Sequence, residues 1–156
     1  MSRVLIIAYG NPLRSDDGVA WRAADVLGER FSTPDVEILR LHQLAPELAD
    51  TVCDFDRVIF VDAALSRGLG IEPGTVRVEE IRAETPDPAR FTHAFSPQKV
   101  VGMAAALYGA NPRAFAVTLC GANFDHGSAL SAIVEDALPA LISTVERLVQ
   151  EAESKA

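Results

Sequence analysis

The sequence has few of the residues that mark secreted, membrane-spanning or nucleic-acid-binding proteins. Two of its 156 residues are cysteines, Cys53 and Cys120, and neither belongs to a C-x-x-C or C-x-x-H pattern, which argues against a disulfide framework or a zinc ribbon. No apolar run approaches the roughly 18 residues of a membrane span. Because 14 basic residues face 22 acidic ones, for a net charge of -8, the chain lacks the basic surface that phosphate backbones require. We therefore expect no nucleic-acid partner and no membrane partner.

The chain also lacks a secretion signal and any sign of a second domain. Its first apolar run, at residues 4–8, is too short for a signal peptide and ends in a glycine turn. No repeat, low-complexity tract or linker interrupts the sequence, of which 49% is hydrophobic. These features predict a single cytoplasmic domain over residues 1–156 with reduced cysteines. For a chain of this charge we expect a monomer.

Short β-branched runs alternate with longer helical patterns along the whole chain. This alternation is typical of an α/β sheet with crossover helices. The runs "VLIIA", "VIFVD" and "FAVTLC" are almost wholly apolar, as in central parallel strands, whereas "TVRVEEI" alternates with charged residues and is expected at an edge. The predicted strands span residues 4–8, 36–41, 57–62, 75–81 and 114–120, and the predicted helices span residues 18–31, 44–52, 97–108 and 129–152.

Polar residues follow several of the predicted strands. Ligands of open parallel sheets bind beyond the carboxyl ends of the strands, so these residues are candidates for a functional site. The loop after the first strand contains neither G-x-G-x-x-G nor G-K-[ST], which excludes a dinucleotide fingerprint and a phosphate-binding loop. The candidates are Gly10, Asn11, Asp16 and Asp17 after the first strand, His42 after the second, Asp62 at the end of the third, and Gly121, Ala122, Asn123, Asp125 and His126 after the last.

The first loop, "GNPLRSDDGVA", carries two adjacent carboxylates. A carboxylate in the first turn of a helix stabilises it, and Asp16 is most simply such a helix-start residue. Asp17 points about 100° away around the helix and is expected to do a different job. We expect Asn11 to face the crevice and Gly18 to leave room for a substrate backbone.

Asp62 and His93 complete a possible metal site with Asp17. Asp62 ends an otherwise apolar strand, where an unpaired carboxylate is costly. His93 lies in residues 83–95, the longest stretch without a regular pattern, and such loops are often functional. Two carboxylates and one imidazole match the protein ligands of an open divalent-metal site. Purely structural roles, a turn cap for Asp62 and a solvated His93, stay open at this point.

Five motifs in order resemble the hydrogenase maturation proteases, endopeptidases that trim the large subunits of [NiFe]-hydrogenases. They are "GNPLRSDDGVA", "VIFVDAA", "PGT", "THAFSP" and "LCGANFDHGSALS", and together they cover nearly the whole chain. The resemblance implies a three-layer α/β/α sandwich with a five-stranded, mostly parallel sheet. It also implies removal of a short C-terminal tail from the precursor after nickel has been loaded.

The same resemblance implies a nickel site. Carried over position by position, the family's ligands fall on Asp17, Asp62 and His93. This chain has Asp17 where some members have Glu, which keeps the oxygen donor. In some members the histidine instead follows Ser-Pro, where this chain has Gln98, so either position is open and His93 is favoured.

The leading hypothesis is therefore a metal-dependent endopeptidase acting on a nickel-loaded large-subunit precursor. The nickel would be held by the protein or supplied by the substrate. The alternative is a non-catalytic nickel-binding maturation chaperone or scaffold on the same fold. A small-molecule hydrolase would rest on fold analogy alone.

Overall fold

The protein contains a five-stranded sheet of order β2-β1-β3-β5-β4. The carboxyl ends of its parallel strands all lie at the same end of the sheet. This computed structural model describes residues 2–65, 71–83 and 95–154. Four strands run parallel, and β4 pairs antiparallel with β5 at the edge, which confirms the edge position predicted for residues 75–81. The strands are β1 (Val4–Tyr9), β2 (Val36–Leu41), β3 (Arg57–Ala64), β4 (Val76–Ile81) and β5 (Arg113–Cys120).

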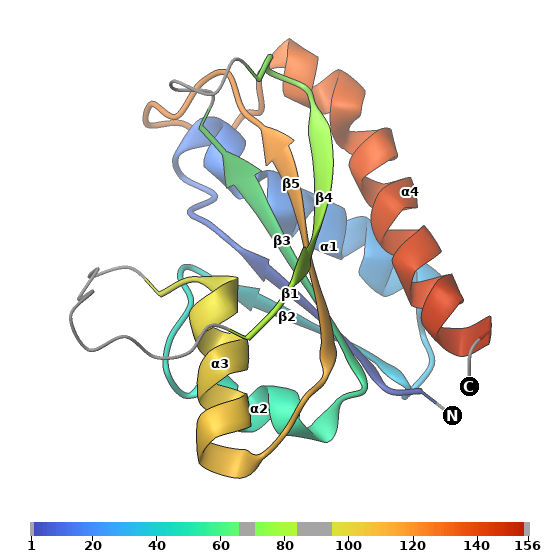
Figure 1. Ribbon diagram of the computed structural model, residues 1–156. Coiled ribbons are helices and arrows are strands. Elements are labelled where there is room, and N and C mark those ends of the chain that lie inside the picture. Colours follow the sequence, from blue (N-terminus) through green and yellow to red (C-terminus); the bar gives the residue numbers. More distant parts are fainter. Residues whose placement is uncertain (1, 66–70, 84–94, 155–156) are drawn as a thin grey trace.

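Helices cover both faces of this sheet, so the predicted three-layer α/β/α sandwich is confirmed (Figure 1). Side chains alternate between the two faces of a strand. Ile6 and Ile59 therefore pack toward α1 and α4, whereas Ile7 and Phe60 pack toward α2 and α3. The helices are α1 (Val19–Arg30), α2 (Leu48–Thr51), α3 (Pro97–Tyr108) and α4 (Ala132–Ser154).

Three predicted helices begin later than their apolar pattern indicated. Residues 44–52 form an α-helix only at α2, followed by the 3-10 turn η2 (Val52–Asp54). The reason is Pro46, because a proline disfavours helical backbone in the residue before it. The 3-10 turn η1 (Ser15–Gly18) precedes α1, and α4 begins at Ala132 instead of residue 129. Within the described ranges, none of the helices combines the length and apolar character that a membrane crossing needs.

The alternation of side chains also decides where the polar residues at the strand ends point. Tyr9 follows Ile7 by two positions, and Asp62 follows Phe60 by two, so both face the α2 and α3 side of the sheet. Strand β3 continues to Ala64, two residues past its predicted end, through pairing with β5. Asp62 is therefore held by regular backbone pairing on a central strand, which fixes the position of its carboxylate.

Candidate functional site

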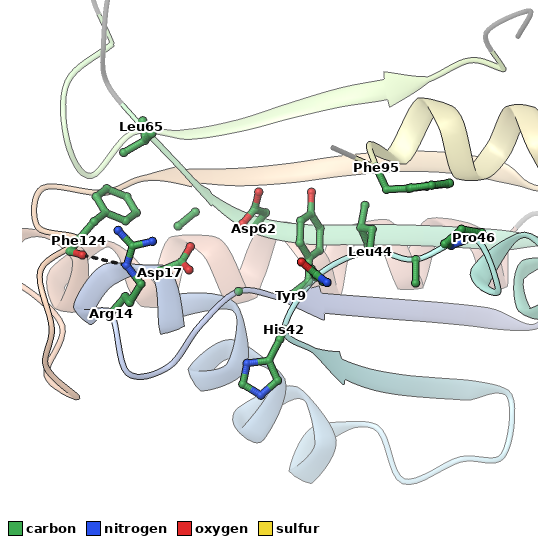
Figure 2. A pocket seen from close by; sticks show the side chains of 14 residues that line it. Tyr9, Arg14, Asp17, His42, Leu44, Pro46, Asp62, Leu65, Phe95 and Phe124 are labelled. Carbon is green, nitrogen blue, oxygen red and sulfur yellow. Dashed lines mark hydrogen bonds between the residues drawn. The ribbon is translucent and has the colours of Figure 1, made fainter. Parts of the chain in front are cut away.

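A pocket of about 560 Å³ opens beyond the carboxyl ends of β1, β2 and β3. Ligand sites commonly have such volumes, so the pocket is large enough for a few residues of a peptide. Figure 2 shows Arg14, Asp17 and Phe124 at one end and Pro46 and Phe95 at the other. Between the two ends lie Tyr9 and Asp62, and His42 lines the pocket from the loop after β2.

Asp17 is held in this pocket by the backbone of the first loop. The Asn11 N–H donates to Asp17 Oδ2 at 2.8 Å, so the carboxylate cannot rotate freely. Gly10 has φ +146°, and a Cβ there would lie 2.1 Å from the Asp17 carbonyl oxygen. A glycine at position 10 is therefore required for the chain to pass this close to Asp17.

Two expectations for the first loop are wrong. The Asn11 side chain does not line the pocket, because its Oδ1 accepts the Leu13 N–H at 2.9 Å and closes a local turn. Gly18 does not leave room for a substrate, because it is buried and a Cβ there would lie 2.8 Å from Pro12 Cα. Gly18 instead lets the loop fold back on itself.

Asp16 is not a cap of the helix that it begins. No side chain caps η1 or α1, and Asp16 is fully buried. Its carboxylate accepts four hydrogen bonds of 2.8–2.9 Å, from the N–H groups of Ala122, Asn123 and Ser131 and from Ser131 Oγ. Although burial raises the pKa of Asp16, these hydrogen bonds bring it below its usual value. Asp16 thus ties the β5–α4 loop to the first loop, and its role differs from that of Asp17 as expected.

Ser15 makes a second connection between the same two loops. Its N–H donates to the Gly127 carbonyl and its hydroxyl to the Asp125 carbonyl, both at 2.8 Å. In return the Gly127 N–H donates to the Leu13 carbonyl at 2.9 Å. Ser15 has φ +52°, an unfavourable conformation for a residue with a side chain, which is held by these bonds. The two loops are therefore joined firmly at the end of the pocket that Arg14, Asp17 and Phe124 line.

The environment of Asp62 in the pocket strongly disfavours its charged form. Burial first, and the charge of Asp17 second, raise its pKa to about 7. The Ala63 N–H and the Tyr9 hydroxyl act in the opposite direction, because they stabilise the charged form. The same surroundings raise the pKa of Tyr9, so the phenol stays protonated. Two carboxylates thus face one pocket and repel each other.

His93, the third predicted ligand, lies outside the described residues. Phe95, two residues later, does line the pocket, whereas Gln98, in the first turn of α3, is not among the lining residues. His42 lines the pocket, and its ring packs against Trp21 with 5.2 Å between ring centroids. Within residues 2–65, 71–83 and 95–154, no three His, Cys, Asp or Glu side chains form a metal-binding group.

The pocket residues that sequence reasoning missed include Tyr9, Arg14 and Phe124. Tyr9 was not recognised as a site residue because it continues an apolar strand. Its position directly before the Gly-Asn turn, at the carboxyl end of that strand, could have indicated it. Arg14 lies within the first motif and is a basic residue of an acidic chain. Phe124 packs over Gly121, where a Cβ would lie 2.6 Å from its ring, and sequence gives no indication of that contact.

Comparison with known proteins gives consistent results. No protein-family model matches the chain. Hydrogenase expression/formation protein HupD of Rhizobium leguminosarum bv. viciae is 31% identical over 156 residues, covering 95% of this chain and 74% of HupD. Hydrogenase 2 maturation protease of Escherichia coli K12 is 32% identical over 102 residues, which cover 63% of this chain. The match spans 57% of that relative's length, little more than half.

A solved structure extends the similarity to the fold. The hydrogenase maturating endopeptidase HybD from E. coli superposes with a TM-score of 0.74 and 26% sequence identity, covering 96% of this chain and 93% of HybD. The sequence match to HupD and the structural match to HybD both extend over almost the whole chain. The chain belongs to the hydrogenase maturation protease family.

Proposed function

We propose that this protein is the endopeptidase that removes the C-terminal tail of a nickel-loaded [NiFe]-hydrogenase large-subunit precursor. The observation that carries the proposal is the pair of carboxylates, Asp17 and Asp62, facing one peptide-sized pocket in a chain of this family. We further propose that it acts in the cytoplasm as a monomer.

Nickel fits the chemistry of the donors. Asp17 and Asp62 offer oxygen atoms to one pocket, and the charge of Asp17 raises the pKa of Asp62, so a divalent cation there would relieve a repulsion. With the imidazole of His93 they would form a mixed oxygen and nitrogen set that suits nickel. When bound, such an ion polarises a peptide carbonyl. Alternatively, these residues would bind nickel that the precursor carries. In that case only a nickel-loaded precursor would bind productively.

Water is the attacking group in this proposal. Among the described residues that line the pocket there is no serine, threonine or cysteine. The thiol of Cys120 is buried, and burial raises its pKa, so it is unsuited to nucleophilic attack. Hydrolysis adds the water oxygen to the carbonyl carbon, breaks the C–N bond and leaves the proton on the released amine. Tyr9 donates its hydroxyl hydrogen to Asp62 and thereby orients this carboxylate in the pocket.

Cleavage of purified precursor tests the proposal. Nickel-loaded and nickel-free large-subunit precursors are incubated with the wild type, with Asp17→Asn, with Asp62→Asn and with the exposed-residue control Asp25→Asn, and the precursor mass is followed. We expect the wild type and the control to release the tail from the loaded precursor only, and both site variants to lose at least 100-fold in rate. An unchanged mass together with nickel binding by the wild type would favour the chaperone or scaffold. Equal cleavage by wild type and both site variants would refute the site.

A further inference from the structure

Arg14 presents unused hydrogen-bond donors beside the carboxylate pair. It is an exposed residue of the first loop, and its guanidinium lines the pocket between the ring of Phe124 and the carboxylate of Asp17 (Figure 2). A guanidinium carries five N–H groups. One of them, on Nε, donates to the Phe124 carbonyl at 3.3 Å. Within the described ranges no other partner of the Arg14 side chain is found, so its terminal N–H groups are available to a ligand.

The orientation of Arg14 is set by its surroundings. The backbone of residues 13–16 is joined to the β5–α4 loop by hydrogen bonds at Leu13, Ser15 and Asp16. The bond from Nε to the Phe124 carbonyl then holds the base of the guanidinium, so its fork turns toward the pocket. The terminal N–H groups are thus directed toward the space that a ligand would occupy.

The loop connection does not depend on Arg14. Ser15 and Asp16 already make the shorter bonds between the two loops, at 2.8–2.9 Å. The Arg14 bond is longer and exposed to solvent. A solvent-exposed bond of this kind contributes little to folding, so a structural role does not account for the position of the guanidinium in the pocket.

The charges nearby select the chemistry of the ligand. Asp17 and Asp62 both line the pocket and would repel a carboxylate bound near Arg14. A neutral peptide carbonyl oxygen accepts hydrogen bonds without that repulsion. The apolar side chains of Phe124 and Leu65 also line the pocket, and Leu65 is 56% exposed. These two side chains offer a contact surface for an apolar side chain of the same peptide.

We propose that Arg14 is a substrate-positioning residue, which donates from its terminal N–H groups to a main-chain carbonyl oxygen of the peptide being cleaved, with the adjoining apolar side chain of that peptide against Phe124 and Leu65. This inference rests on the proposed endopeptidase function. Because the contact forms with the bound substrate and persists in the transition state, its loss raises KM and leaves kcat nearly unchanged.

Steady-state cleavage of nickel-loaded precursor separates this role from others. The variants are Arg14→Gln, Arg14→Lys and Arg14→Ala, with Arg22→Gln as control, since Arg22 is also exposed and pairs with one side chain, Glu135, outside the pocket. We expect KM to rise about tenfold or more in Arg14→Gln with kcat within threefold, an intermediate KM in Arg14→Lys, and no change in the control. Added guanidinium ion at millimolar concentration should restore cleavage by Arg14→Ala and not affect the wild type.

Three results would overturn the inference while leaving the endopeptidase proposal intact. They are unchanged KM in Arg14→Gln, a loss confined to kcat, and a loss in Arg14→Ala that accompanies a lowered melting temperature and is not rescued by guanidinium. If the wild type itself leaves the precursor uncut, the proposed function fails. Binding of loaded precursor to wild type and Arg14→Gln, measured by calorimetry, then decides on Arg14, because equal affinities would refute the contact and weaker binding by the variant would support it.

Discussion

The carboxylates of Asp17 and Asp62 face the same pocket from different elements, and the charge of Asp17 contributes to a pKa of about 7 at Asp62. Asp17 comes from the turn before α1 and Asp62 from the central strand β3. Two like charges are thus brought together by the fold, one fixed by the Asn11 N–H and the other by sheet pairing. This arrangement costs stability in the metal-free protein, which is a frequent property of functional sites.

Replacing Asp17 with Asn should lower the pKa of Asp62 in the metal-free protein. Burial would still act on Asp62, so its pKa should stay above the ordinary value of 3.8, but the repulsion from Asp17 would be gone. Carboxyl ¹³C NMR titration of wild type and variant measures the change directly. Asp25→Asn, which alters an exposed aspartate paired with Arg40, serves as the control. An Asp62 titration that is the same in wild type and Asp17→Asn would contradict the coupling.

Asp62→Asn should stabilise the metal-free protein at pH 8. Because the folded pKa of about 7 exceeds the ordinary 3.8, the folded state binds more protons between these values, and the free energy of unfolding falls as pH rises through this window. An asparagine carries no charge, so the variant avoids the free-energy cost of ionising residue 62 in the folded state, which is on the order of 1–4 kcal/mol at pH 8. Urea unfolding at pH 8 and pH 3.5 checks the sign, since the gain should be much smaller at the lower pH. A less stable variant at pH 8 would show that the Asp62 charge is compensated.

Asp16→Asn should have the opposite effect. The buried Asp16 carboxylate accepts four hydrogen bonds. The side-chain NH₂ of an asparagine would face some of these N–H and O–H donors, so we expect the free energy of unfolding to fall by about 2–4 kcal/mol at pH 7. Its pKa is lowered in the folded state, so the stability it supplies is present above pH 3.8 and is lost as pH falls through the folded pKa.

Urea unfolding from pH 7 to pH 2.5 measures this dependence. The difference between wild type and Asp16→Asn should shrink below pH 3.8. Asp125→Asn, an exposed aspartate in the same β5–α4 loop, should be nearly neutral at every pH. Equal stability of Asp16→Asn and wild type at pH 7 would mean that Asp16 does not hold the two loops together.

Most of the fold could be predicted because its signals are local. Continuous apolar runs identified β1, β3 and β5, and alternation with charged residues placed β4 at an edge. The bounds of α3 were predicted correctly because Pro97 begins it and Gly109, with φ +66°, ends it. The helix predicted at residues 44–52 was too long because its apolar periodicity begins before Pro46, whereas Pro46 disfavours helical backbone in the residue before it.

The site was only partly predictable because its members meet through tertiary contacts. Sequence reasoning distinguished Asp16 from Asp17 by their angular separation, but assigned Asp16 to its own helix. Its hydrogen-bond partners lie more than 100 residues away, at Ala122, Asn123 and Ser131, and no local pattern indicates them. Arg14 was overlooked for the same reason, since its function depends on Phe124, which lies in a distant loop.

Substitution can decide whether the proposed third nickel ligand is His93 or Gln98. We expect His93→Ala to abolish cleavage of loaded precursor and to weaken nickel binding at least tenfold, because an imidazole is the strongest remaining donor for this ion. Gln98 lies at the start of α3, outside the set of residues that line the pocket, so Gln98→Ala should keep both properties within threefold. His42→Ala is the matched control, since it removes an imidazole that lines the pocket but packs against Trp21. If the protein itself holds the nickel, calorimetric nickel titration and precursor cleavage should change together in His93→Ala. A variant at Gln98 that loses nickel while His93→Ala keeps it would transfer the ligand role to the position after Ser-Pro.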